Sequence, residues 1–299
     1  MKILIIGAGA IGALYGGKLA QAGAEVSITC RSDYDVIKKN GFHIKSCLGD
    51  FDFKPKYVLR EAAEYKDTAD FIIVTTKVLP QISAIDLIKP ALHSNSSILL
   101  LQNGIHIEKP IAAAFPKHHL ISGLAFVCAS KETPGIINHQ DYGKVTIGDY
   151  PNGCSDKTKL LAQLWNQVGI NCTTSPTIQT DRWKKLIWNA AFNPMSVLAG
   201  GITTKEIMTN NLTKDLAQKI MQEVYLLAQA DNCALPESII ADNLDATAKM
   251  TPYKTSMLLD FESKRPMEVE AILGNAVKFA QNKNIATPYL SSLYALISR

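Results

Sequence analysis

Three stretches of the 299-residue sequence carry groups whose type and spacing could do chemistry. The first is a glycine-rich segment near the N-terminus, residues 7–12. The second is a line of polar residues, Lys185, Asn189 and Asn193, in an otherwise apolar segment. The third surrounds Glu268. Glycine turns hold phosphates, and lysines and carboxylates move protons, so the elements that position these residues come next.

The glycine segment reads Gly-x-Gly-x-x-Gly, follows the apolar run 3–6 and precedes apolar residues at helical spacing. This order predicts strand, tight turn and helix. Gly7 permits the turn, Gly9 lets a pyrophosphate approach the backbone, and Gly12 lets helix and strand pack closely. The phosphates would bind free N–H groups at the positive end of the helix. A glycine-rich turn without a ligand is the alternative. The cofactor-binding residues expected in this stretch are Gly7, Gly9, Ala10, Ile11 and Gly12.

The end of the second predicted strand, residues 25–30, should select the cofactor. An acidic residue about 20 positions beyond the glycines bonds the ribose 2′-hydroxyl of NAD, whereas an arginine accommodates the 2′-phosphate of NADP. Arg31 stands at this strand end and favours NADP. Asp33 follows two residues later and points mildly to NAD, although Asp33 or Ser32 could instead cap the predicted helix 34–39.

Two further polar residues follow predicted strands of the same sheet. Lys77 comes shortly after strand 70–75, and Asn103 comes shortly after strand 97–101. Each alone would pass for an ordinary loop residue. Ligands of an open parallel sheet gather outside the carboxyl ends of its strands, so the succession favours a binding site.

The chain changes character near Pro176. Before it, a further hairpin is predicted with its turn at residues 139–143, which makes His139 more plausibly structural than catalytic. After it, only helical periodicity is evident. We therefore expect an α/β Rossmann-type N-terminal domain, residues 1–176, followed by an all-α C-terminal domain, residues 177–299.

The predicted helix 178–193 carries Lys185, Asn189 and Asn193 at i, i+4 and i+8, and hence on one side. Asparagine is unfavourable inside a helix because its side chain competes for the backbone. A solvent-facing stripe is one interpretation. The polar wall of a substrate cleft is the other.

Glu268 lies just after Pro266, which suits the first turn of a new helix. An acidic residue in that turn could simply interact favourably with the positive end of the helix dipole. Because Glu268 precedes Ile272 by four residues, it could instead lie beside the apolar face of this predicted helix. Its carboxylate would then be partly shielded from water and could interact electrostatically with a lysine.

Bulk composition excludes several classes of protein. The net charge of +4 comes without a long basic block, so no nucleic-acid partner is expected. Six scattered cysteines without paired spacing indicate free thiols and no metal site, as in a reduced, cytoplasmic protein. Glycines interrupt the N-terminal apolar segment, which argues against a signal peptide, and no run is long enough to span a membrane.

Taken together, these motifs resemble the ketopantoate reductase (2-dehydropantoate 2-reductase) family over nearly the whole chain. The resemblance is carried by the glycine motif, Arg31, Thr76-Lys77, Gln102-Asn103-Gly104, Trp183-x-Lys185-Leu186-x-x-Asn189-x-x-x-Asn193-Pro194, Ser256-Met257-Leu258-x-Asp260 and Glu268. It implies NADPH-dependent reduction of a 2-oxo acid, ketopantoate, to the 2-hydroxy acid, pantoate, in pantothenate and coenzyme A biosynthesis.

The resemblance also implies roles for individual residues. Lys185 would be the general acid, and Glu268 would hold that lysine and the forming hydroxyl. The substrate would be oriented by Asn103, Asn189, Asn193 and Ser256, and Arg31, Lys77, Asn103 and Glu268 would contact NADP(H). The partner is then a small 2-oxo acid, and the C-terminal helices could form a homodimer face.

Other functions stay open. A reductase of the same family could act on another 2-oxo acid, and a different dehydrogenase with a helical substrate domain could act on another hydroxy acid or a sugar acid. A non-catalytic NADP-binding sensor would need no proton donor, so Lys185 and Glu268 argue against it.

Overall fold

The structure is a computed structural model that describes residues 1–298. The chain forms two compact units, and each is described by itself. The first unit comprises Met1–Lys77, Ile82–Gln102 and Glu108–Ile178, and the second comprises Val78–Gln81, Asn103–Ile107 and the chain from Gln179 onward. Two short segments from the first half of the chain, 78–81 and 103–107, therefore belong to the second unit.

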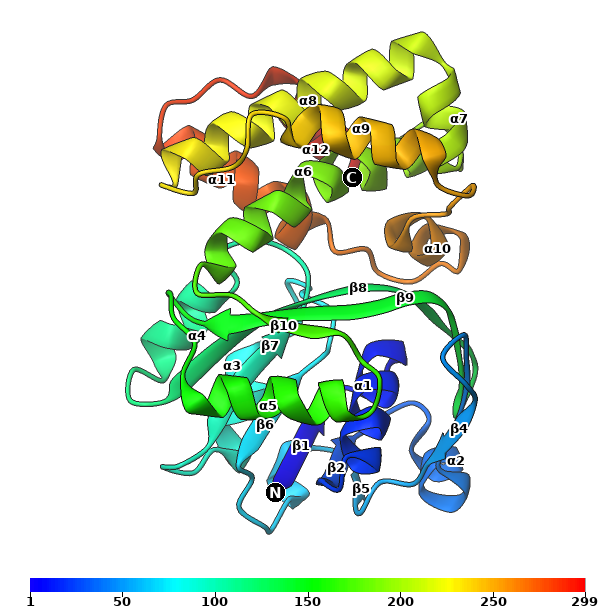
Figure 1. The fold of residues 1–299 in the computed structure, drawn as a ribbon, viewed down its shortest axis with the longest axis vertical. Coiled ribbons are helices and arrows are strands. Elements are labelled where there is room, and N and C mark those ends of the chain that lie inside the picture. Colours follow the sequence, from blue (N-terminus) through cyan, green and yellow to red (C-terminus); the bar gives the residue numbers. More distant parts are fainter. Residues whose placement is uncertain (299) are drawn as a thin grey trace. The chain divides into compact units, whose positions relative to one another are not determined.

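The first unit is built on one ten-stranded sheet (Figure 1). Its strands are β1 (Lys2–Ile6), β2 (Glu25–Thr29), β3 (Phe42–Ser46), β4 (Phe51–Phe53), β5 (Val58–Leu59), β6 (Phe71–Val74), β7 (Ser97–Leu101), β8 (His119–Thr133), β9 (Ile136–Asp149) and β10 (Cys172–Thr174). The order is β4-β3-β9-β8-β7-β6-β1-β2-β5, and β10 pairs with β9. Strands β2, β1, β6, β7 and β8 run parallel. Continuous burial of β1, β6 and β7 agrees with apolar strands covered on both faces.

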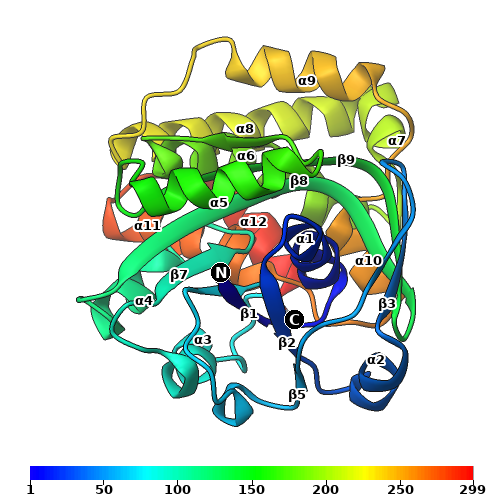
Figure 2. The same ribbon diagram turned by 60° about the horizontal axis from the view of Figure 1, so that its bottom comes forward.

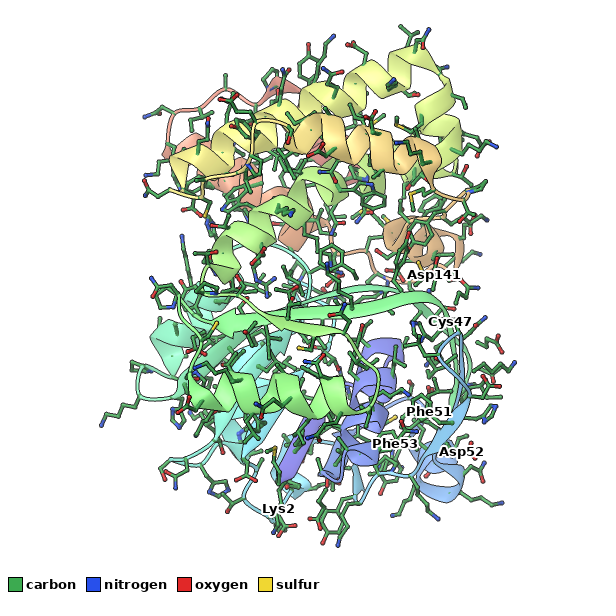
Figure 3. The ribbon with its side chains drawn as sticks, in the orientation of Figure 1. Lys2, Cys47, Phe51, Asp52, Phe53 and Asp141 are labelled. Atoms are coloured by element: carbon green, nitrogen blue, oxygen red, sulfur yellow. The ribbon has the colours of Figure 1, made fainter. Side chains whose placement is uncertain are left out.

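The helices of this unit connect and cover the strands. They are α1 (Ala10–Gln21), α2 (Tyr34–Asn40), α3 (Ala84–Ile88), α4 (Glu108–Ala114) and α5 (Asp156–Gln167), with short 3₁₀ turns η1 (Ala62–Glu64) and η2 (Lys89–Ala91). Figure 2 shows β8 and β9 arching around α1. Alternation along β4 turns Phe51 and Phe53 toward α1 and Asp52 outward, as the side chains in Figure 3 show. A Cβ at Gly17 would come within 2.8 Å of the Phe51 ring, so glycine is required for this packing.

The second unit is helical (Figure 1). Its helices are α6 (Ile178–Leu198), α7 (Thr204–Thr209), α8 (Asn211–Ala230), α9 (Ile239–Lys249), α10 (Ser256–Glu262), the π-helix η3 (Glu270–Gly274), α11 (Asn275–Asn282) and α12 (Pro288–Ile297). A separate apolar core joins α6 and α8 with α11 and α12, and Ile105 contributes to it. No strand follows Thr174 in the described part of the chain. The expected order, an α/β Rossmann-type region followed by an all-α region, is confirmed.

The predicted turn at residues 139–143 is wrong. These residues lie inside the single strand β9, which pairs antiparallel with β8. The β8–β9 turn is at Pro134 and Gly135, where Gly135 has a φ of +79°. A proline followed by a glycine is a common turn sequence, and it accounts for the position of this turn. Residues Tyr142 (φ 62°) and Gly143 (φ 115°) form an irregularity in the strand, which interrupts the alternation and mimicked a turn.

Two predicted helix limits also differ. α6 continues through Pro194 to Leu198 because Met195, Ser196 and Val197 remain buried, and this packing offsets the lost backbone hydrogen bond. The helix expected to open at Pro266 begins only at Val269. Among residues 1–298, no helix is both long and apolar enough to cross a membrane.

Candidate functional site

The glycine turn joins β1 to α1 with its backbone in unusual positions. Gly7 has a φ of +116°, which favours glycine, and a Cβ at Gly12 would lie 2.0 Å from the Gly7 carbonyl oxygen. A Cβ at Gly9, in contrast, would meet no atom within 4 Å. Gly7 and Gly12 are therefore required by the fold, whereas Gly9 leaves open space above the backbone.

Neighbouring strands hold this turn. The Gly7 N–H donates to Thr29 Oγ1 at 3.2 Å, and Thr75 Oγ1 donates to the Gly7 carbonyl at 2.8 Å. No side chain caps the N-terminus of α1, and its first turn has no acidic residue. The first N–H groups of the helix, including those of Ala10 and Ile11, lack intrahelical partners and form a place where an anion can bind.

The end of β2 presents Arg31 and Asp33 differently. Arg31 is exposed, but Asp33 is only 7% exposed. Asp33 stands at the N-cap of α2 without capping it through its side chain. Its Oδ2 accepts instead from Lys131 Nζ at 2.6 Å. Of the two candidates at this strand end, only Arg31 is open to a ligand.

The ends of β6 and β7 lie side by side. Gln102 Nε2 donates to the Thr76 carbonyl at 2.5 Å, and a Cβ at Gly7 would lie 3.0 Å from the Thr76 nitrogen. Lys77, half-buried, follows directly. Within the first unit, the structure thus brings Lys77 to the strand end next to the glycine turn.

In the second unit, three residues distant in sequence form a chain of hydrogen bonds. Lys185 Nζ donates to Asn103 Oδ1 at 2.9 Å, and Asn103 Nδ2 donates to Glu268 Oε2 at 3.0 Å. The other carboxylate oxygen, Oε1, accepts from the Val78 N–H at 3.0 Å. Lys185, Asn103 and Glu268, which we predicted from separate motifs, therefore lie together.

The loop that carries Asn103 is fixed by the helices around it. Arg182, only 2% exposed, donates from Nη1 to the Gly104 carbonyl at 2.9 Å. Asn275 Nδ2 donates to the Ile105 carbonyl at 2.9 Å. Gly104 has a φ of +98°, and a Cβ there would lie 2.6 Å from the Ala271 carbonyl oxygen. Only glycine allows this approach, so Gly104 is required by close packing beside the π-helix η3.

The environment of Lys185 lowers its pKa to about 8. Burial of the ammonium group is the main cause, and the positive charge of Arg182 adds to it, while Glu268 opposes the shift. A lysine with this pKa exchanges a proton near neutral pH and is suited to general acid–base catalysis. Sequence reasoning missed Arg182, although a second cation three residues before Lys185 in an apolar helix was a usable signal.

Asn189 and Asn193 are both buried, so the interpretation of a solvent-facing stripe is wrong. Asn193 is only 2% exposed, and its Oδ1 has no hydrogen-bond partner within the described residues. Ser256 is exposed at the start of α10. Asn189 and Asn193 share a helix side with Lys185 by their spacing.

His139 belongs to the first unit and is bonded within its sheet. His139 is buried within β9, where its Nδ1 lies 2.9 Å from Ser46 Oγ. Burial lowers the pKa of its imidazole. Across residues 1–298, no group of three or more His, Cys, Asp or Glu side chains could hold a metal ion.

Comparison with known proteins accounts for both halves of the chain. Residues 3–152 match the model of ketopantoate reductase PanE/ApbA, and residues 177–299 match the model of its C-terminal region. A 2-dehydropantoate 2-reductase of Nostoc sp. is 35% identical, with 98% of this chain and 93% of the relative covered.

Solved structures agree. The crystal structure of 2-dehydropantoate 2-reductase from Methylococcus capsulatus superposes with a TM-score of 0.94 at 44% identity, covering 100% of this chain and 96% of that one. D-mandelate dehydrogenase in a ternary structure with NADH and anilino(oxo)acetate has a TM-score of 0.91 at 25% identity, covering 100% and 97%. With both family models matched and relatives similar over their full length, the chain belongs to the ketopantoate reductase family.

Proposed function

We propose that this protein reduces ketopantoate to pantoate with NADPH. The observation that carries the proposal is the hydrogen-bonded chain of Lys185, Asn103 and Glu268, in which the lysine has a pKa of about 8. Membership of the family and the Nostoc and Methylococcus relatives support the substrate. Residues 1–176 are assigned to the cofactor and residues 177–299 to the substrate and the proton.

The first unit fits a dinucleotide phosphate. The open space above Gly9 and the uncapped N-terminus of α1 would hold the pyrophosphate on the N–H groups of Ala10, Ile11 and Gly12. Exposed Arg31 would bind the 2′-phosphate, which is the basis for choosing NADP over NAD. Lys77 would add positive charge at the neighbouring strand end.

When bound, reduced nicotinamide supplies hydride to the 2-oxo carbon. The protein's task is to orient the carbonyl and supply one proton to its oxygen as negative charge develops there. Lys185 Nζ would give that proton and become neutral, a change that its lowered pKa makes inexpensive. Glu268 would favour the ammonium form before the reaction and orient the forming hydroxyl. Asn103 would keep the two groups apart at a fixed separation.

Substrate binding is assigned to the amides on the same helix side as Lys185. Asn193 has a buried oxygen that finds no partner among residues 1–298. Burying such a group unpaired is unfavourable, so a hydroxyl or ammonium donor would satisfy it. Ketopantoate carries a hydroxyl of this kind. Asn189 and Ser256 would contact the carboxylate end.

A different 2-oxo acid is the second candidate, because D-mandelate dehydrogenase bound to anilino(oxo)acetate has the same fold at 25% identity. Trp188 and Tyr253 lie with ring centroids 6.4 Å apart in the second unit and could accept an aromatic group.

The test is the loss of absorbance at 340 nm with purified protein. NADPH and NADH are each paired with ketopantoate and with a panel of 2-oxo acids that includes an aromatic one. Fast turnover of NADPH with ketopantoate alone is expected. Turnover with another 2-oxo acid alone would identify that acid as the substrate in place of ketopantoate. No turnover despite tight NADPH binding would favour a non-catalytic NADP-binding sensor.

The role of Lys185 is tested by Lys185→Ala, with exposed Lys184→Ala on the same helix as the matched control. The first should lower kcat by about 10²- to 10⁴-fold while NADPH affinity is retained. Near-normal turnover of the Lys185 variant would refute its assignment as the acid.

A further inference from the structure

An acidic residue lies buried where the second strand would contact a cofactor ribose. Asp33 stands 21 positions after Gly12, close to the spacing of about 20 at which an acid bonds the ribose 2′-hydroxyl of NAD. Its carboxylate is nevertheless 7% exposed and lies 2.6 Å from Lys131 Nζ. The neighbouring Arg31 is exposed. The acid is therefore engaged by a lysine, and the arginine is left for a ligand.

Sheet topology, not sequence proximity, brings the lysine to this place. Lys131 lies near the tip of the β8–β9 hairpin, opposite Ile137. Ile137 in turn pairs with Ile44 of β3, the strand that follows α2 and hence Asp33. The hairpin belongs to the same compact unit as β2, so this contact is part of one body.

The local charges define the consequence. Arg31 and Lys131 carry one positive charge each and Asp33 one negative charge, so the group has a net charge of about +1 with the lysine and about 0 without it. A 2′-phosphate carries up to about two negative charges near neutral pH and is attracted by the first arrangement only. A carboxylate already bonded to an ammonium group is also a poor acceptor for a ribose 2′-hydroxyl.

We propose that Lys131 determines the preference for NADP over NAD, by holding Asp33 away from the ribose and leaving Arg31 to the 2′-phosphate. This inference rests on the proposed function only for the use of NADP(H). It assigns a specificity role to a residue of β8, outside the glycine turn and the end of β2.

The experiment measures binding of two probes that lack the nicotinamide half, adenosine 2′,5′-bisphosphate and 5′-AMP, by isothermal titration calorimetry. Lys131→Met should weaken binding of the bisphosphate about tenfold and leave 5′-AMP within about twofold, because a freed Asp33 repels the phosphate or pairs with Arg31. Removing the acid as well, in Asp33→Asn/Lys131→Met, should restore the bisphosphate to within about threefold of wild type.

The matched control is Lys45→Met. Lys45 pairs with Glu132 at 2.7 Å beside the same hairpin tip, and both side chains are about as exposed as Lys131 or more so. This variant should change neither probe. The NADPH-to-NADH affinity ratio, from the fluorescence of the bound dinucleotides, should fall about tenfold in Lys131→Met only.

Two results would overturn the inference if Lys131→Met folds. The first is an unchanged ratio of bisphosphate affinity to 5′-AMP affinity in Lys131→Met. The second is a double variant that binds the bisphosphate as weakly as Lys131→Met, which would make the ion pair merely structural.

If Lys131→Met does not fold, the Asp33→Asn variant decides the question. A retained preference for the bisphosphate supports the inference, and a loss of 5′-AMP binding refutes it. A wild-type protein that binds both probes equally would instead refute the NADP assignment itself.

Discussion

Replacing Lys185 with methionine should inactivate the protein and stabilise it at neutral pH. Lowering the pKa of this lysine from 10.5 to about 8 means that folding disfavours its ammonium form by about 3 kcal/mol at pH 7. That figure already includes the opposing attraction of Glu268. Methionine keeps most of the apolar stem but loses the hydrogen bond to Asn103, worth about 1 kcal/mol. A net gain of about 2 kcal/mol is expected.

The pH dependence separates this effect from ordinary repacking. The folded lysine loses its proton near pH 8 and the unfolded one near 10.5, so between these values the unfolded state binds more protons. Wild-type stability therefore rises relative to the variant across this window. The advantage of Lys185→Met should shrink to near zero by about pH 10.

Urea unfolding at pH 7 and pH 10, followed by tryptophan fluorescence, measures the difference. Trp183 and Trp188 report on the second unit, and Lys184→Met on the same helix is the control, with no change expected at either pH. In parallel, the wild-type rate of 2-oxo acid reduction should decline above about pH 8, as the proton donor becomes neutral. The reasoning would be refuted if Lys185→Met were less stable than wild type at pH 7. It would also be refuted if the difference in the free energy of unfolding were the same at both pH values, because burial of the Lys185 ammonium group would then not be its cause.

Four further substitutions test the fold of the glycine turn and the binding assignments. Gly12→Ala should destabilise the protein by about 3 kcal/mol in thermal unfolding, because its Cβ would lie 2.0 Å from the Gly7 carbonyl oxygen. Gly9→Ala should fold normally and weaken NADPH binding about tenfold in a fluorescence titration, since its Cβ meets only the open space proposed for the pyrophosphate. Similar behaviour of the two variants would contradict a folding role for Gly12 and a binding role for Gly9. Asn193→Leu should retain or gain stability in urea, because it removes a buried oxygen that has no hydrogen-bond partner among the described residues. The same variant should raise the KM for the 2-oxo acid about tenfold. An unchanged KM would show that Asn193 does not contact the substrate. Arg31→Ala should weaken NADPH about tenfold in calorimetry and NADH less than twofold, and an equal loss of both would refute binding of the 2′-phosphate.

Local patterns were sufficient for most of the architecture. The apolar run before Gly7, the glycines and the helical spacing after them predict β1, the turn and α1, because each depends on neighbours a few residues away. The limits of β7 agree with the predicted strand 97–101 for the same reason. The loss of strand patterning after Pro176 likewise indicated the helical region.

Local reasoning failed where distant packing decides the outcome. α6 passes through Pro194 because Met195, Ser196 and Val197 beyond it are buried. Residues 139–143 remain part of β9 because β8 pairs along them and β3 pairs with His139, despite the positive φ angles at Tyr142 and Gly143. Asp33 stands at the N-cap position of α2, but its carboxylate accepts a hydrogen bond from Lys131, 98 residues away in the sequence.

By itself, then, the sequence determined the fold class, the glycine turn and the types of residue available for chemistry, since these follow from composition and short-range spacing. Only the tertiary structure decided that Lys185, Asn103 and Glu268 form one chain of hydrogen bonds. It also decided that Arg182 lies close enough to help lower the pKa of Lys185. The physical reason is that hydrogen bonds and desolvation depend on distances in space, which residues from separate elements acquire only when those elements pack.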